Sequence, residues 1–349
     1  MRNDHAALAA LAPMEARLVS KLPQDDGWQF EPKWDGFRCL ALREGRDLQM
    51  HAKSGKPLGR FFPEVAQALS TLKARRFLLD GELIIPVGAR LSFGALQMRL
   101  HPAASRILKL SRETPALFMA FDLLAEGAAI LLQRPLTERR VQLERFFERE
   151  KSVQTLRLSA CTRSLELAKQ WLAKADRGIL DGVIAKPLHE PYRPAKRAML
   201  KVKCLRTADC VVGGFRYATR SRVVGSLLLG LYNNAGLLDH VGFTSGIAQR
   251  DRGALTRKLE ALRGGSGFTG DAPGAPSRWS TERSAAWEPL KPKLVVEVEY
   301  DQVTGERFRH GTRLLRWRPD KAPKQCTKDQ LAPEVSPSSL RLQEAFGLS

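Results

Sequence analysis

The chain has 349 residues, of which 43% are hydrophobic, and a formal net charge of +20. This length suggests two ordinary domains, and the hydrophobic fraction is typical of a globular protein. No apolar run approaches the roughly 20 residues needed to cross a bilayer, which argues against a membrane-spanning protein. The first 206 residues carry 36 Lys and Arg against 22 Asp and Glu, and the remainder carries 21 against 15. A basic excess spread over both parts favours an extended polyanion as the partner.

Cysteine usage indicates a reducing compartment. The cysteines are odd in number, and none are paired at metal-binding spacing, so we expect free thiols in a cytosol and no zinc site. They are Cys39, Cys161, Cys204, Cys210 and Cys326.

Hydrophobic periodicity predicts a mixture of strands and helices in the first two hundred residues. The predicted strands span residues 37–42, 47–51, 77–85 with an interruption at Asp80-Gly81, 117–124, 180–185 and 200–204. The predicted helices span residues 61–72, 136–150 and 164–175. This mixture predicts an α+β domain built around a largely antiparallel sheet.

The pattern changes after Ala208, where short strands predominate. They are predicted at residues 211–217, 226–232, 237–244, 294–302 and 314–318, with one helix at 251–262 and a loop at 264–277. Five strands and one helix predict a small barrel of the OB type, which often binds nucleic acid. The predicted division is therefore 1–206, 207–332 and a polar tail at 333–349.

Lys33 stands in the most informative stretch of the chain, Glu-Pro-Lys-Trp-Asp-Gly-Phe-Arg at residues 31–38. A carboxylate precedes it by two residues, an Asp-Gly turn follows, and Arg38 lies five residues on. Lysine is a weak nucleophile at neutral pH, so an enzyme that attacks phosphorus with it must hold it rigidly among positive charges. This arrangement is suited to both tasks.

Several further clusters repeat the same chemistry along the chain. Each alone is more typical of a turn, a solvated face or a core position, and only their order and spacing are specific. Lys201 and Lys203 share one face of a strand because side chains alternate. The other clusters are centred on Lys53, Asp80-Gly81-Glu82, Phe121-Asp122, the pair Asp181 and Lys186, and the run from Arg316 to Lys321.

In this order the clusters resemble the motifs of the covalent nucleotidyltransferases, which comprise DNA ligases, RNA ligases and mRNA capping enzymes. The stretch at 31–38 and the stretch Leu-Arg-Trp-Arg-Pro-Asp-Lys at 315–321 look most like ATP-dependent DNA ligases, and closest to small bacterial ligases of the LigC and LigD type. The resemblance runs from Lys33 to Lys321. It implies an adenylation domain followed by an OB-fold domain, and the sealing of DNA breaks in repair or end joining.

The resemblance also implies roles for individual residues. Lys33 matches the nucleophile that becomes adenylated, Glu31 the residue at the adenine edge, and Phe121 the ring that stacks on adenine. The remaining implied ATP contacts are Arg38, Lys53, Glu82, Arg197 with Arg193 as a rival, Lys201 and Lys203. The implied pyrophosphate-orienting residues are Arg318, Asp320 and Lys321.

The chain departs from the family pattern at three of these positions. Lys53 stands where the family usually has arginine, and Met199 where it often has tryptophan. Asp181 replaces the usual glutamate, so its carboxylate is one methylene shorter. The resemblance implies that Glu82 and Asp181 hold Mg²⁺ or Mn²⁺ together with phosphate oxygens and water.

The implied reaction has three in-line displacements, in which positioning and charge neutralisation dominate. Lys33 takes AMP from ATP, AMP passes to the 5′-phosphate at a break, and the 3′-hydroxyl displaces AMP. We expect the C-terminal domain to close and open about a linker at residues 206–208. The expected partners are nicked or broken double-stranded DNA and a Ku-like end-binding protein. The protein is expected to be a monomer in the bacterial cytoplasm, at the nucleoid.

Two alternatives remain open from the sequence. An RNA ligase or a capping guanylyltransferase belongs to the same superfamily, and a capping enzyme would be labelled by GTP instead of ATP. A non-catalytic OB-fold protein would bind nucleic acid through its basic surface and would never carry covalent AMP on Lys33.

Overall fold

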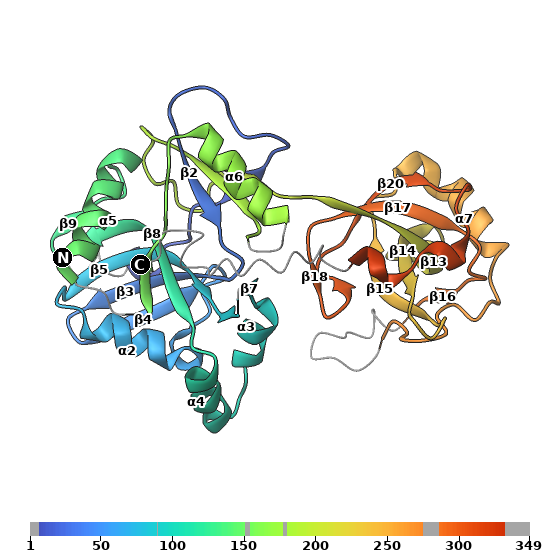
Figure 1. The fold of residues 1–349 in the computed structure, drawn as a ribbon, viewed down its shortest axis with the longest axis horizontal. Helices are drawn as coiled ribbons and strands as arrows, with labels where there is room; N and C mark the ends of the chain where they lie inside the picture. The colour runs from blue at the N-terminus through green and yellow to red at the C-terminus, as the bar shows by residue number, and fades with distance from the viewer. Residues whose placement is uncertain (1–6, 89, 151–153, 177–179, 275–285, 332–349) are drawn as a thin grey trace. The chain divides into compact units, whose positions relative to one another are not determined.

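The computed structural model describes residues 7–88, 90–150, 154–176, 180–274 and 286–331 (Figure 1). The chain divides into two compact units between Cys204 and Leu205. The domain boundary predicted after Arg206 lies two residues further along. The predicted tail at 333–349 lies outside the described residues.

The first unit contains a six-stranded sheet with the order β10-β8-β5-β3-β4, and β9 pairs with β8. Every pair in it is antiparallel except β10 with β8. Apolar side chains of three helices, α2, α5 and α3 (Phe93–Arg99), pack with the sheet in one core. The strands are β3 (Phe37–Glu44), β4 (Asp47–Ala52), β5 (Arg76–Ile84), β8 (Leu117–Glu126), β9 (Ala129–Ile130) and β10 (Leu156–Leu158), and the helices are α2 (Pro63–Thr71) and α5 (Leu136–Glu150).

A second sheet of four strands, in the order β1-β12-β11-β2, completes the first unit. Helix α6 packs with this sheet in a separate apolar core, which also includes side chains of β5 and β8. The two sheets therefore face a shared interior. The strands are β1 (Ala16–Leu18), β2 (Trp28–Lys33), β11 (Gly182–Pro187) and β12 (Met199–Val202), and the unit's other elements are α6 (Leu165–Asp176), α3 (Phe93–Arg99), α4 (Ala104–Glu113) and the pair β6 (Pro86–Val87) and β7 (Arg90–Leu91).

The second unit is a barrel with the strand order β15-β14-β13-β17-β20. A bridge between Thr244 and Thr312 joins its two edges, and five strands in a small barrel are typical of an OB-fold. Helix α7 contacts β14. The α+β class with a C-terminal OB-fold is thus confirmed. The elements are β13 (Arg206–Tyr217), β14 (Val224–Tyr232), β15 (Leu238–Thr244), α7 (Arg252–Glu260), β16 (Glu288–Pro289), β17 (Val295–Tyr300), β18 (Val303–Thr304), β19 (Arg307–Phe308) and β20 (Arg313–Trp317).

Three local predictions are wrong. Strand β5 runs unbroken through Asp80-Gly81, and the irregularity there is a shift in its pairing with β8. The helix predicted from residue 61 begins at Pro63, because proline has the backbone angle of a first helical residue. The predicted linker at 206–208 is instead the start of β13, where these residues pair with β17.

Strand β2 was not predicted from the sequence, although it ends at Lys33. Trp28, Gln29, Phe30 and Glu31 alternate apolar and polar, but this run is only four residues long and Pro32, which disfavours a strand, follows it. These residues are nevertheless paired with β11 along the whole strand. The lysine thus stands at the end of a strand, and Trp34 separates it from Asp35-Gly36.

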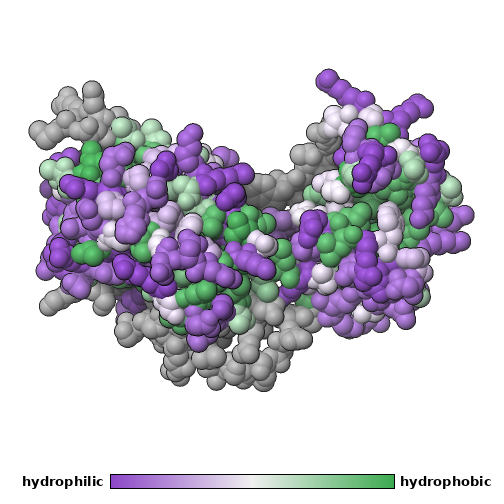
Figure 2. All heavy atoms as spheres, turned by 90° about the horizontal axis from the view of Figure 1, so that it is seen from above, coloured by the Kyte–Doolittle hydropathy of each residue, from purple (hydrophilic) through white to green (hydrophobic). Residues whose placement is uncertain are grey.

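The face of the molecule drawn in Figure 2 is covered mainly by hydrophilic residues, with smaller hydrophobic areas between them. Among the described residues, no helix has the length and apolar character that a membrane crossing requires. All five cysteines are free thiols.

Candidate active site

A cavity of about 210 Å³ lies within the first unit, lined by strands of both of its larger sheets. The predicted site residues that meet there are up to 170 positions apart in the sequence, from Glu31 to Lys201. The predicted site residues that line it are Glu31, Lys33, Arg38, Lys53, Glu82, Phe121 and Lys201, and its other lining residues include Met14, Glu15, Ile184, Lys186 and Met199. The dispersed sequence clusters therefore form one site.

Two glycines allow the chain to pack closely around Lys33. A Cβ atom on Gly36 would lie 2.1 Å from the carbonyl oxygen of Leu83. A Cβ atom on Gly182 would lie 2.1 Å from the carbonyl oxygen of Val202, and Gly182 has a φ of +141°. Only glycine fits such approaches without moving the backbone. The Asp-Gly pairs at these positions are thus required for packing and are not merely turn formers.

Lys33 and Lys203 share one carboxylate. The Nζ atom of Lys33 lies 2.5 Å from Oδ2 of Asp181, and the Nζ atom of Lys203 lies 3.2 Å from the same oxygen. Asp181 is buried, and its backbone N–H donates to the carbonyl oxygen of Lys33 at 2.9 Å. The shorter side chain of Asp181 therefore still reaches the amine. Burial lowers the pKa of Lys201, and the charges of Lys33 and Lys203 lower it further.

Glu31 and Lys186, which both line the cavity, form a buried ion pair. The Nζ atom of Lys186 lies 2.8 Å from Oε2 of Glu31, and both side chains are less than 5% exposed. Gln29 donates from Nε2 to Oε1 of Glu31 at 2.8 Å. The same amine of Lys186 lies 4.5 Å from the centre of the Phe121 ring. Sequence reasoning noted the spacing of Asp181 and Lys186 but assigned Lys186 no role.

Phe121 occupies a bulge in β8. Asp80 of β5 pairs with Asp122 of β8, but the next residue, Gly81, pairs with Ala120, so Phe121 has no partner on β5. Bulges reorient a side chain and are common beside active sites. The bulge explains how an aromatic residue in a buried strand comes to line the cavity.

Arg38 is held by a buried carboxylate that sequence reasoning did not include. Its Nε and Nη2 atoms lie 2.5 and 2.6 Å from the two oxygens of Asp80, and Tyr192 donates to Asp80 at 2.7 Å. Burial would lower the pKa of Arg38, but the charge and hydrogen bonds of Asp80 outweigh it and raise the pKa. The guanidinium also lies 4.4 Å from the centre of the Phe121 ring.

Glu82 is the carboxylate whose environment is most strongly perturbed. Burial raises its pKa to about 7; the charges of Lys33 and Arg38 oppose this shift, and those of Asp35 and Asp80 add to it. The described residues contain no group of three or more side chains arranged to hold a metal ion. A carboxyl group with a raised pKa that lines a cavity nevertheless fits a site for a divalent cation, because such a cation can take its other ligands from phosphate and water.

Glu15 brings two of the remaining predicted residues to the rim. The Nζ atom of Lys53 lies 2.9 Å from Oε2 of Glu15, and Nε of Arg197 lies 3.8 Å from it. The hydrogen bond from Lys53 lowers the pKa of Glu15. Arg193, the alternative to Arg197, pairs instead with Glu190. Neither Arg193 nor Arg197 lines the cavity.

The three predicted pyrophosphate-orienting residues lie together in the second unit, around Asp209. Arg318 and Lys321 both donate to the Asp209 carboxylate, at 2.9 and 2.8 Å. Arg318 also donates from Nη2 to Asp320 at 2.8 Å. That hydrogen bond lowers the pKa of Asp320 to about 2. Asp209 was not predicted from the sequence.

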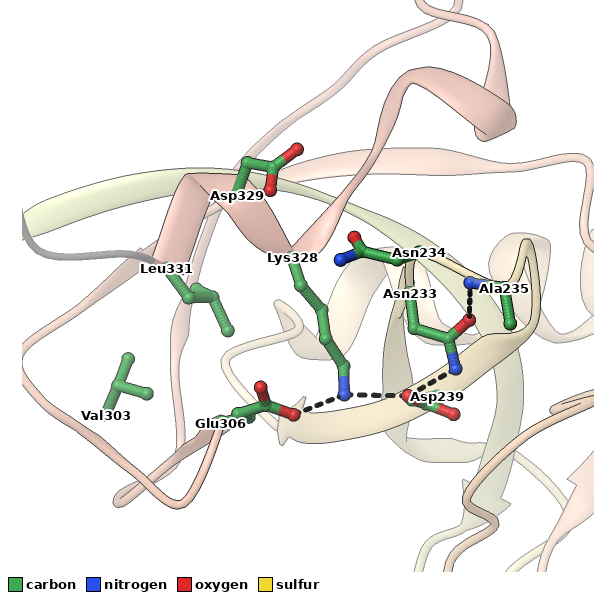
Figure 3. Close-up of a pocket in the computed structure, with 9 residues that line it drawn as sticks. All are labelled: Asn233, Asn234, Ala235, Asp239, Val303, Glu306, Lys328, Asp329 and Leu331. Atoms are coloured by element: carbon green, nitrogen blue, oxygen red, sulfur yellow. Dashed lines mark hydrogen bonds and ion pairs between the residues drawn. The ribbon is translucent and has the colours of Figure 1, made fainter.

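A hollow of about 680 Å³ also lies in the second unit, but its polar groups mostly satisfy one another (Figure 3). The amine of Lys328 lies between Asp239, at 2.7 Å, and Glu306, at 2.6 Å. Asn233 donates from Nδ2 to Asp239 at 3.0 Å. This hollow therefore lacks the clustered lysines of the first unit's cavity.

Two family models match the chain. The ATP dependent DNA ligase domain matches residues 7–203, and the ATP dependent DNA ligase C terminal region matches residues 220–321. The first range includes the residues that line the cavity, and the second includes Arg318, Asp320 and Lys321 but not Asp209.

Curated relatives match nearly the whole chain. It is 43% identical over 334 residues to DNA ligase C1 of Mycolicibacterium smegmatis, covering 92% of this chain and 93% of the relative. It is 39% identical over 336 residues to DNA ligase C of Mycobacterium tuberculosis, with the same two coverages. The multifunctional non-homologous end joining protein LigD of Pseudomonas aeruginosa is 30% identical over 300 residues, 84% of this chain and 34% of that protein.

A solved structure from a structure-function study of Lig E DNA ligases has a similar fold. Its TM-score is 0.56 at 17% sequence identity, and the match covers 87% of this chain and 100% of the other.

Proposed function

Because this chain belongs to the ATP-dependent DNA ligase family and is an ATP-dependent DNA ligase, we propose that Lys33 is its adenylated nucleophile. The proposed place of adenylation is the cavity of the first unit. The observation that carries the proposal is the place of the amine. It lines a half-open cavity together with Lys201, a buried Glu31–Lys186 pair and the ring of Phe121. A nucleophile, phosphate-binding cations and a base-binding pocket are the parts that nucleotidyl transfer needs.

The pair of Glu31 and Lys186 supports adenine as the base. Adenine presents an amino group where guanine presents a carbonyl oxygen. A carboxylate only accepts hydrogen bonds, so Glu31 favours the amino group and repels the guanine oxygen. Hydrogen bonds from Gln29 and Lys186 leave lone pairs on the carboxylate free to accept from the base. We place the adenine between this edge and the Phe121 ring.

The first step follows from the position of the lysines. The neutral amine of Lys33 attacks the α-phosphorus, a P–N bond forms, the bond to pyrophosphate breaks, and one amine proton is released. Lys201 and Lys203 stabilise the charge on the α-phosphate, because both amines belong to the same cluster as Lys33. The contact with Asp181 opposes the step, since a carboxylate stabilises the protonated amine. Lys203 weakens this opposition by sharing the same oxygen.

Glu82 and Asp181 are the residues that we propose to hold Mg²⁺ or Mn²⁺. Glu82 lines the cavity with Lys33, and Asp181 contacts the amine of Lys33 at 2.5 Å, so both carboxylates lie beside the proposed nucleophile. When bound, the ion would offset negative charge at the α-phosphate and at these carboxylates. Arg38, Lys53 and Arg197 are proposed as further nucleotide contacts.

The later steps need DNA in place of pyrophosphate. We propose that the 5′-phosphate of a break accepts AMP from Lys33, and that the 3′-hydroxyl then displaces AMP. Arg318, Asp320 and Lys321 are proposed to orient the pyrophosphate during the first step only. This role requires the second unit to approach the cavity for that step and to withdraw before DNA binds.

The cellular role proposed is DNA repair or end joining, because one of the relatives carries end joining in its name. A Ku-like end-binding partner, a monomeric state and a place at the bacterial nucleoid in the cytoplasm belong to the same proposal. The basic excess of both parts of the chain supports a DNA surface.

Labelling of the protein tests the proposal directly. Wild type and K33A are incubated with α-labelled ATP or GTP and Mg²⁺, and are analysed on a denaturing gel and by acid treatment. The matched control is K169A, because Lys169 is an exposed lysine of the first unit that pairs only with Glu166 among the contacts described.

Wild type and K169A are expected to acquire an acid-labile label from ATP and not from GTP, and K33A none. Equal labelling of K33A would refute the assignment of the nucleophile. Labelling by GTP in preference to ATP would refute the assignment of the base pocket.

A further inference from the structure

The outer face of the sheet formed by β13, β17 and β20 carries charged side chains that oppose one another across the strands. Directly paired residues share a face of a sheet. Asp209 of β13 pairs with Glu297 of β17, which pairs with Arg316 of β20. Ala208 and Cys210, on either side of Asp209, belong to the apolar core of the barrel. Asp209 therefore lies on the same outer face as Arg316.

Asp209 is the carboxylate that both proposed pyrophosphate-orienting cations share. Arg318 donates from Nη1 to its two oxygens at 2.9 and 3.0 Å, and Lys321 donates from Nζ to Oδ2 at 2.8 Å. The side chain of Asp209 is 11% exposed, against 62% for that of Asp320. The two cations thus converge on an enclosed carboxylate, whereas the carboxylate of Asp320 is open to solvent.

The backbone of Asp209 is fixed by groups other than these cations. Its N–H donates to Oε1 of Gln330 at 2.9 Å, and Nε2 of Gln330 donates to its carbonyl oxygen at 3.2 Å. Gln330 belongs to the short 3-10 helix η4 (Lys328–Leu331). Lys328, at the start of η4, is anchored to Asp239 of β15 at 2.7 Å (Figure 3). Asp209 is therefore a fixed point against which Arg318 and Lys321 are set.

We propose that Asp209 is a positioning residue for the adenylation step, acting through Arg318 and Lys321. The inference rests on the proposed role of these two cations at the pyrophosphate. Both side chains are long, and much rotamer freedom must be lost before they act in one geometry. A shared carboxylate removes that freedom before ATP arrives. In-line displacement is sensitive to such alignment, so that a misplacement of about 1 Å can cost roughly 100-fold in rate.

The carboxylate of Asp209 could act through its charge, by weakening the attraction for ATP, or by positioning Arg318 and Lys321. These two roles predict opposite results for D209N. The substitution D209N keeps the shape of the side chain but removes its negative charge. If the charge merely weakens attraction for ATP, D209N should bind ATP more tightly and adenylate at least as fast. If Asp209 positions the cations, the maximal rate should fall while the apparent KM for ATP changes little.

The experiment measures single-turnover formation of labelled protein over a range of ATP concentrations, and separately the sealing of a pre-adenylated nick. The variants are D209N, D209E, R318A and the control E299Q. Glu299 is a carboxylate of the same sheet that pairs with Arg313 at 2.8 Å and contacts neither proposed cation in the described contacts. Thermal unfolding of each variant is recorded.

D209N is expected to adenylate about 10- to 100-fold more slowly at saturating ATP, with sealing of the pre-adenylated nick within about twofold of wild type. D209E should recover part of the rate, and E299Q should match wild type. Normal adenylation by D209N when R318A is slow would overturn the inference about Asp209 alone. Normal adenylation by R318A would overturn the proposed role of Arg318 and the inference with it. Loss of both reactions in D209N and D209E, with lower Tm, would show a merely structural role and also overturn the inference.

Discussion

Replacing Glu82 by Gln should make the first unit more stable at alkaline pH while it impairs adenylation. In the folded protein the pKa of Glu82 is about 7, against 4.5 for an ordinary glutamate. A raised carboxyl pKa means that the folded state binds the proton more tightly than the unfolded state. The wild type therefore loses stability as pH rises from about 4.5 to 7, and the penalty is complete above pH 7.

The size of this effect follows from the two pKa values. Their difference of about 2.5 corresponds to about 3 kcal/mol at ~1.36 kcal/mol for each pKa unit. At pH 5 part of the penalty is already present, so the advantage of E82Q over wild type should grow by about 2 kcal/mol between pH 5 and pH 8. For a unit of about 200 residues this corresponds to a widening of the Tm difference by roughly 4–8 °C.

Thermal unfolding of wild type and E82Q at pH 5, 6, 7 and 8 measures the difference, and other titrating groups cancel in the comparison. Labelling by ATP is measured in parallel and should fall strongly in E82Q, because the proposed metal contact is lost. Excess Mg²⁺ should raise the Tm of wild type at pH 8 and leave E82Q unchanged. Parallel Tm curves for the two proteins across this pH range would refute the reasoning about Glu82.

Three further predictions concern the packing, the base pocket and the DNA surface. G36A should lower the Tm and slow adenylation at least about tenfold, because its Cβ would lie 2.1 Å from a carbonyl oxygen. The control G94A in helix α3, where the Cβ would meet no atom closer than 4.0 Å, should be neutral or stabilising. Normal labelling of G36A would contradict the packing argument. K186M should lower the free energy of denaturant unfolding by about 3–5 kcal/mol, because it leaves Glu31 buried without its partner. The double variant E31Q/K186M should recover most of this loss. Equal losses in K186M and E31Q/K186M would count against the ion pair. Binding to nicked duplex, measured by fluorescence anisotropy, should weaken at least about tenfold between about 50 and 200 mM salt, and salt-independent binding would argue against a phosphate-binding basic surface.

Much of the chemistry of the site could be predicted from the sequence because it depends on residue type and local spacing. Lys33 between a carboxylate and an Asp-Gly turn, the paired Lys201 and Lys203, and the basic run that ends at Lys321 are local signals. The five strands and single helix of the OB-fold are equally local, because each is a short periodic segment between turn residues. These signals were sufficient to indicate the family, and the comparisons confirm it.

The partners of these residues could not be predicted in the same way. The sequence contains no local signal that joins Lys33 to Asp181, Arg38 to Asp80, or Glu31 to Lys186. Strand β2 itself was not predicted, because its alternating run is short and is followed by Pro32, which disfavours a strand. The bulge at Phe121 depends on the register between β5 and β8 and leaves no mark in the composition of either strand.

The sequence by itself determined which reactive groups the chain carries and in what order, since amines, carboxylates and an aromatic ring are properties of single residues. Only the tertiary structure decided which carboxylate faces which cation. Strand pairing brings residues more than a hundred positions apart within hydrogen-bonding distance, and a register shift of one residue would turn the same side chains to the opposite face. Asp209 illustrates the point, because Arg206 stands only three residues before it, yet the cations that it holds are Arg318 and Lys321, more than a hundred positions further along the chain.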